Sequence, residues 1–215
     1  AQVRRDMERF RGLAHTAGHY ALGRGHLALG EPEDARRELE EAWRQGYRTP
    51  EVALASARAH AELLRARLER VRRQRDEEAR QAGLELAERE LRQPALRLLE
   101  RVGTQSSQEA MLVRGLLELA AREPSGVLKR ADELAALDPG SAEAAARADT
   151  LRGEAHLQQA KELRWGKDRS SQGRALGQAR EAFARAIETL RSDPTSQLGL
   201  CRAWNATVEA EADAG

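Results

Sequence analysis

A set of small and large apolar residues recurs along this chain at helical spacing, and it constrains the fold more than any other feature. The recurrence has the period of a pair of helices joined by a short turn, so each copy predicts one helical hairpin. Stacked hairpins bury a continuous core between neighbouring copies. The first copy consists of Leu22, Gly23, His26, Gly30, Ala35, Leu39 and Ala42.

Packing between two helices explains the spacing within this first copy. Gly23 and Ala35 are small where the helices of the hairpin cross closely, and Leu39 fills the gap between neighbouring copies. Gly30 ends the first helix in a turn. Pro32 then begins the second helix at its first turn, where the missing N–H group costs nothing.

Three further copies follow the same frame. The second carries Ala57 and His60 on its first helix and Ala95 and Leu99 on its second. The third consists of Gly115, Pro124, Val127, Ala131, Leu134 and Pro139. The fourth consists of Gly153, His156, Ala179, Phe183, Ala186 and Pro194.

Two of the copies contain insertions. Ala57 and Ala95 are 38 residues apart, against 12 for Gly23 and Ala35, so about 26 residues are inserted in the second copy. Gly153 and Ala179 are 26 residues apart, so the fourth copy holds about 14 extra residues.

The frame resembles the 34-residue tetratricopeptide repeat. This resemblance implies an all-α fold, a solenoid of about four helical hairpins that forms one superhelical domain over residues 1–215. The repeats are expected at 16–50, 51–105, 108–141 and 144–195, with a capping helix or partial fifth repeat at 196–212.

The larger insertion is charged, which predicts long helices that project as a hairpin. Residues 65–75 carry six arginines against one acid, and residues 76–90 carry six acids against two arginines. An antiparallel hairpin would set the basic arm against the acidic arm, and this pairing is favoured over nucleic-acid binding. Pro94 is expected to kink or restart the second arm. The smaller insertion includes Trp165–Ser171, whose turn-forming residues predict a loop.

Composition limits the classes of function. The formal net charge of +1 argues against a nucleic-acid binder. No apolar run approaches the roughly 20 residues that a membrane span needs. Cys201 is the only cysteine, so no intramolecular disulfide is possible and a cytoplasmic location is expected. The missing initiator Met suggests that the chain is one region of a longer protein.

Four segments that link the helices carry a second resemblance. They are His19–Gly25, Gly46–Val52, Glu90–Leu96 and Ser192–Pro194. They resemble the tetratricopeptide region that follows the kinase domain in a group of bacterial serine/threonine protein kinases. The catalytic motifs of a kinase are absent from the sequence, so the resemblance implies an accessory region without activity of its own. Such a region could recruit substrates, sense a partner or support self-association.

The repeat frame predicts which residues line the concave groove formed by the first helices. Arg24 and Arg58 occupy equivalent positions in adjacent repeats and could pair with acidic groups or a terminal carboxylate of a bound peptide. A solvated groove face, with the partner bound elsewhere, is the open alternative. The predicted lining residues are Tyr20, Arg24, Leu27, Leu54, Arg58, Leu112, Leu116, Glu154 and Gln158.

Other chemistry receives little support from the sequence, and no cofactor or metal is expected. His15 and His19 have the outer spacing of a zincin helix, but Thr16 replaces the required Glu. His26, His60 and His156 follow a small residue where the repeat places an aromatic side chain, which favours a packing role over a pH-sensing ladder. Cys201 is expected to be a buried, inert thiol.

These observations predict a binding module for a protein or peptide partner and no enzymatic activity of this chain. Two alternatives stay open. The inserted hairpin could drive homo-oligomerisation, or the chain could be the sensor region of a transcriptional regulator.

Overall fold

The computed structural model describes residues 16–101, 107–164, 168–191 and 193–213. In these ranges every regular element is a helix, which confirms the all-α class. The chain forms two compact units, Ala1–Val113 and Arg114–Gly215, called unit 1 and unit 2 below. Each unit is described by itself. A continuous superhelix over the whole chain remains a prediction of the repeat pattern.

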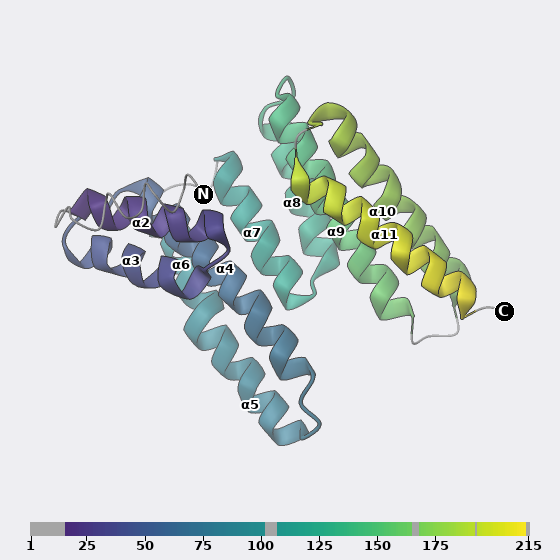
Figure 1. Cartoon of the computed structure of the whole chain (residues 1–215), viewed down its shortest axis with the longest axis horizontal. Helices are drawn as coiled ribbons and strands as arrows, with labels where there is room; N and C mark the ends of the chain where they lie inside the picture. Colours follow the sequence, from purple (N-terminus) through teal and green to yellow (C-terminus); the bar gives the residue numbers. More distant parts are fainter. Residues whose placement is uncertain (1–15, 102–106, 165–167, 192, 214–215) are drawn as a thin grey trace. The chain divides into compact units, whose positions relative to one another are not determined.

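Unit 1 begins with a hairpin of two helices, α2 (Thr16–Leu29) and α3 (Pro32–Arg44) (Figure 1). Gly23 lies where these helices cross, because a Cβ atom at this position would be 2.5 Å from Cγ of Leu39. Leu39 itself is fully buried. The core of this part of unit 1 consists of Leu27, Ala35, Leu39, Ala42, Val52, Ala55 and Ala59, with Tyr20, Trp43 and Tyr47 packed against it.

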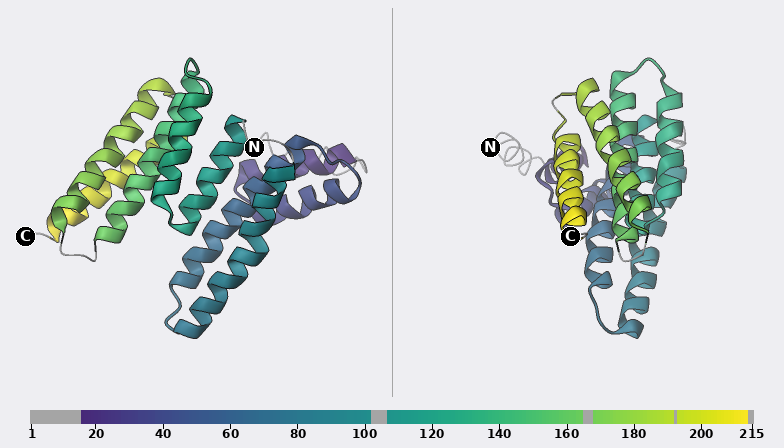
Figure 2. Two further views of the ribbon diagram at one scale, coloured as in Figure 1. Left: turned by 180° about the vertical axis from the view of Figure 1, so that it is seen from behind. Right: turned by 90° about the vertical axis from the view of Figure 1, so that its right-hand side faces the viewer.

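The rest of unit 1 is a long hairpin. Its first arm is α4 (Pro50–Arg72), and its second arm consists of α5 (Glu77–Ala87), the π-helical turn η1 (Glu88–Arg92) and α6 (Gln93–Arg101). The ends of α4 and α5 extend beyond the other helices of unit 1 (Figures 1 and 2). The charged insertion is therefore mostly helical. Its inner face is apolar and buried, with Leu64, Leu68 and Val71 supplied by α4.

The turn η1 shows how the second arm accommodates Pro94. A proline in a helix lacks the N–H that would bond to the preceding turn. The wider hydrogen-bonding pattern of a π-turn lies immediately before this position, and the backbone on both sides stays helical at Ala87 and Gln93. The backbone of the second arm therefore stays helical from η1 into α6.

An ion pair joins the basic and the acidic arm of the hairpin, as the sequence predicted. Arg67 of α4 pairs with Glu90 of η1 at 2.7 Å. Within the acidic arm, Arg80 pairs with Glu77 of its own helix. Arg70 and Arg73, near the end of α4, are exposed.

Unit 2 is built around one long helix. α9 (Ala142–Leu163) contacts α8 (Pro124–Leu137), α10 (Arg169–Thr189) and α11 (Pro194–Ala212). α7 (Gln108–Ala121) spans the boundary between the units. The expected loop at Trp165–Ser171 is wrong for its second half, because Asp168 caps α10 by accepting from the backbone N–H of Ser171. Trp165–Lys167 lie outside the described residues.

Phe183 is the centre of the unit 2 core. It is fully buried on α10. A Cβ atom on Gly153 of α9 would lie 2.7 Å from its ring, and a Cβ atom on Gly199 of α11 would be closer still. Phe183 thus packs against two helices at positions where only glycine fits. The pair Gly153–Phe183 has the same frame positions as Gly23–Leu39 in unit 1.

The two units also contain the same turn between helices. Glu31 and Glu123 have identical backbone angles, φ −110° and ψ 68°, and each precedes a proline that begins a helix. The residue before each glutamate has positive φ, with Gly30 at 72° and Arg122 at 60°. This conformation suits glycine and is unfavourable for residues with a Cβ atom.

Replacing Arg122 by glycine is therefore expected to stabilise unit 2 by about 0.5–1 kcal/mol, because glycine adopts positive φ without steric cost. Gly30→Ala in unit 1 is the matched control and should destabilise by about the same amount. Urea titrations of the two variants test this. Destabilisation by Arg122→Gly would show that its side chain contributes more than the strain removes.

Candidate binding surface

Two aromatic side chains and one basic side chain of unit 1 lie together, and two of the three, Tyr20 and Arg24, were predicted to line the groove. The rings of Tyr20 on α2 and Tyr47, which follows α3, are 5.9 Å apart and tilted by 58°. Arg24 donates to the Tyr20 hydroxyl at 3.0 Å. Its guanidinium carbon also lies 6.0 Å from the ring centre. Tyr20 therefore fixes the position of an exposed arginine.

The second predicted arginine is also exposed. Arg58 lies on α4, a helix that contacts both α2 and α3. Its Nε donates to Glu62 one turn later at 3.4 Å. Because an exposed pair one helical turn apart contributes only a few tenths of a kcal/mol, Arg58 can exchange Glu62 for another carboxylate at low cost.

Two of the apolar residues that were assigned to the groove are buried. Leu27 and Leu54 are each only 8% exposed, and Leu27 belongs to the core cluster of unit 1. The expectation that Leu27 offers an apolar contact to a ligand is therefore not met. Tyr47 was missed, because the helical spacing that identifies groove residues does not extend into the link after Gly46.

The remaining predicted residues belong to α7 and α9. Leu112 lies in unit 1 and Leu116 in unit 2, and both are half-buried on α7. Glu154 on α9 pairs with Arg202 of α11. Gln158, one turn later, donates to Glu162 at 3.5 Å. Glu154 is thus engaged in holding two helices of unit 2 together.

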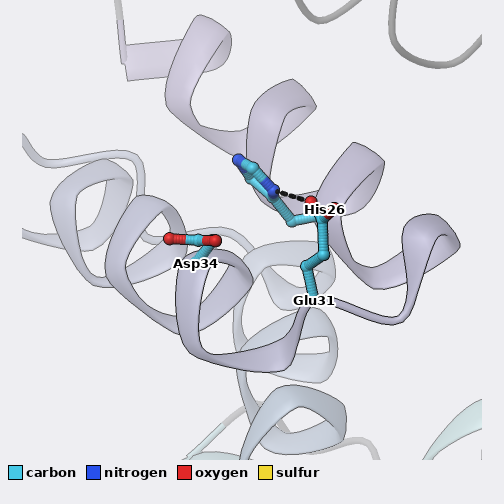
Figure 3. A group of neighbouring side chains, drawn as sticks. All are labelled: His26, Glu31 and Asp34. Carbon is cyan, nitrogen blue, oxygen red and sulfur yellow. Dashed lines mark hydrogen bonds and ion pairs between the residues drawn. The ribbon is translucent and has the colours of Figure 1, made fainter.

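One group of side chains in the described residues has the composition of a metal site. His26, Glu31 and Asp34 offer ligand atoms that all lie within 4.8 Å of one another (Figure 3). His26 is buried, and its Nδ1 lies 2.8 Å from Glu31. Asp34 pairs with Arg37. The contact of His26 with Glu31 joins the end of α2 to the start of α3, and the pair of Asp34 with Arg37 lies within α3. The group therefore has a structural role in the hairpin turn.

A second histidine is buried without a partner for one of its ring atoms. His60 on α4 is 6% exposed, and its Nδ1 makes no hydrogen bond. Burial, together with the nearby charge of Arg36, lowers the pKa of His60 to about 4. His60 is therefore neutral at physiological pH and packs as the sequence predicted.

The prediction for Cys201 is wrong. The thiol was expected on a buried face, but Cys201 is exposed on α11. Gly199 and Ala203, at other positions of this helix, pack inward.

Of the two histidines with zincin-like spacing, His19 lies 2.8 Å from Glu38, and His15 is outside the described residues.

An open hollow of about 540 Å³ lies in unit 2 between α9, α10 and the start of α8. It contains none of the predicted groove residues. Its lining consists of Pro124, Gln159, Glu162, Leu163, Ser171, Arg174, Ala175 and Gln178.

No helix in the described ranges is both long and apolar enough to cross a membrane. Comparisons with protein-family models, with curated proteins and with solved structures return no match for this chain.

Proposed function

We propose that this chain is a protein-interaction scaffold of tetratricopeptide type, and that unit 1 binds an acidic segment of a protein partner. Arg24 and Arg58 supply the charge in this proposal, and Tyr20 and Tyr47 supply the aromatic surface beside Arg24. In its specific form, the chain is the non-catalytic, cytoplasmic recruiting region of a bacterial serine/threonine kinase.

The observation that supports the scaffold most strongly is the repeated contact between a glycine and a large side chain. Gly23 and Leu39 have the same positions in the repeat frame as Gly153 and, across an insertion, Phe183. Both pairs are in close contact. The matching turns at Glu31 and Glu123 also indicate that the two units contain copies of the same repeat. Hairpin scaffolds of this kind bind partners through the exposed faces of their helices.

An acidic partner is favoured by the state of the two arginines. Each is exposed, and each is held by a weak contact on its own helix, Arg24 by Tyr20 and Arg58 by Glu62. A peptide carboxylate can accept two parallel hydrogen bonds from a guanidinium group, which the tyrosine hydroxyl cannot. Binding would therefore replace weak contacts with stronger ones.

Charge reversal at both positions tests this proposal. Arg24→Glu with Arg58→Glu is expected to weaken binding of short glutamate-rich peptides by at least about tenfold, measured by fluorescence anisotropy at low salt. Arg37→Glu with Arg44→Glu is the matched control, because these exposed arginines of α3 also pair within their own helix. Equal loss in both variants would indicate nonspecific attraction and would refute the proposed site.

The projecting hairpin is the second candidate, as a module for self-association. Its apolar residues Leu64, Leu68 and Val71 are buried within unit 1, and Leu86 is its one large apolar side chain among the described residues that is exposed, at 37%. The hairpin therefore offers charge more than apolar surface to a partner.

A further inference from the structure

The last helix of unit 2 exposes a face with large apolar side chains, although the guanidinium of Arg180 on α10 lies over the ring of Trp204, 4.3 Å from its centre. Leu198, Trp204 and Val208 of α11 are 61%, 52% and 62% exposed. They belong to a stripe at helical spacing that contains no charged residue, although 33% of the chain is charged. The exposed residues of this stripe are Pro194, Gln197, Leu198, Cys201, Trp204, Asn205, Val208 and Ala212.

Other contacts fix the orientation of α11 within unit 2. Gly199 packs on Phe183. The hydroxyl of Ser196, which is fully buried, lies 2.7 Å from that of Thr150 on α9. At the end of the helix, Glu209 pairs with Arg164 at 2.9 Å. The helix that carries the stripe is therefore held in place by contacts with α9 and α10.

Two positions of this face are buried in one earlier helix each, α2 and α7. The residue before the packing glycine is Leu22 in α2, with 6% exposure, and Leu198 in α11, with 61%. The residue two places after this glycine is Leu117 in α7, with 1% exposure, and Cys201 in α11, which is exposed. At these two positions, α11 lacks the cover that α2 and α7 have.

We propose that a second copy of this chain covers the stripe, with the two α11 helices packed antiparallel about a two-fold axis near residue 203. The stripe is self-complementary in this arrangement. Leu198 of one copy lies opposite Val208 of the other, and Cys201 lies opposite Asn205. Antiparallel packing also aligns the helix dipoles favourably.

The charges at the ends of the stripe fit the same pairing. Arg191 precedes α11, whereas Glu211 lies in its last turn. Both are exposed, and neither makes an ion pair within the described ranges. Antiparallel packing brings Arg191 of each copy towards Glu211 of the other. Parallel packing would leave acidic ends side by side.

The surface area buried between two α11 helices sets the expected affinity of the dimer. A helix of 19 residues is about 28 Å long. One helix pair buries less surface than the 1,200–2,000 Å² typical of stable complexes. The dimer is thus expected to form at micromolar concentrations and to dissociate on dilution.

Light scattering of the full chain over a range from low to several hundred micromolar tests the dimer. The mass of the wild type should rise towards twice the monomer mass, and Leu198→Glu with Val208→Glu should remain monomeric. Leu86→Glu with Leu137→Glu is the matched control, because both leucines are exposed at 37% on other helices. A monomeric wild type, or a dimer that survives the α11 double variant, would overturn the proposal.

Disulfide cross-linking tests the orientation. In the antiparallel pair, Asn205→Cys places a cysteine opposite Cys201 of the other copy, so mild oxidation with glutathione disulfide should yield a covalent dimer. Wild type, with Cys201 alone, should cross-link much less. Efficient cross-linking of the wild type would indicate parallel helices and overturn the antiparallel arrangement. Peptide binding by unit 1 is measured separately, so either proposal can fail alone.

Discussion

Phe183→Ala is expected to lower the free energy of unfolding of unit 2 by about 3–5 kcal/mol. Phe183 is fully buried, and its ring packs against Gly153 on α9 and Gly199 on α11. Neither glycine has a side chain that could move into the space left by the ring. The cavity would therefore persist, and three helices would lose contacts at once.

Hydrogen exchange of the full chain, combined with urea titration, measures this effect for each unit. Amides of α9 and α10 should lose protection in Phe183→Ala, and amides of α2 and α3 should not. Leu39→Ala is the matched variant in unit 1 and should show the reverse pattern, with a cost of about 2–5 kcal/mol. A cost below about 1 kcal/mol for Phe183→Ala would contradict the central packing role of this ring.

Protonation of His60 is expected to lower the stability of the wild-type chain at acidic pH, and His60→Phe should abolish this effect. The pKa of His60 is about 4 in the folded chain, against 6.5 for the exposed side chain. Between these values the unfolded state binds the proton and the folded state does not, so stability falls as the pH falls from about 6.5 towards 4. The shift corresponds to a loss of up to about 3 kcal/mol, all of it absent above pH 6.5.

Phenylalanine fills similar space and cannot titrate. The difference in unfolding free energy between His60→Phe and wild type should therefore grow as the pH is lowered. Carboxylates that titrate in the same range are common to both proteins and cancel in this difference. Urea titrations at several pH values give the measurement. Parallel pH profiles for the two proteins would mean that His60 is accessible to protons in the folded state.

Local spacing predicted the helices of this fold and the small residues at which the two helices of a hairpin cross. Gly23 and Gly153 were predicted at such crossings, and in the structure each lies against a large side chain of the second helix, Leu39 and Phe183. Such contacts depend on the residues of one hairpin, so the sequence contains the information needed to find them. The helical nature of the charged insertion was predictable for the same reason.

Contacts between neighbouring hairpins were harder to predict from the sequence. Leu27 and Leu54 were assigned to a groove but are buried. Cys201 was assigned to a core but is exposed, because no described helix covers that side of α11. Gly115 packs on Leu151 of α9, which belongs to the next copy. Helical spacing defines the faces of a helix, whereas the packing of its neighbours decides which face is covered.

Arginine side-chain NMR spectra during titration with a glutamate-rich peptide test the proposed function most directly. The Nε–H signals of Arg24 and Arg58 are expected to shift first and to saturate together, because both side chains exchange a weak contact for a peptide carboxylate. Shifts confined to Arg70 and Arg73 of the projecting hairpin, with Arg24 and Arg58 unchanged, would contradict the proposed binding surface.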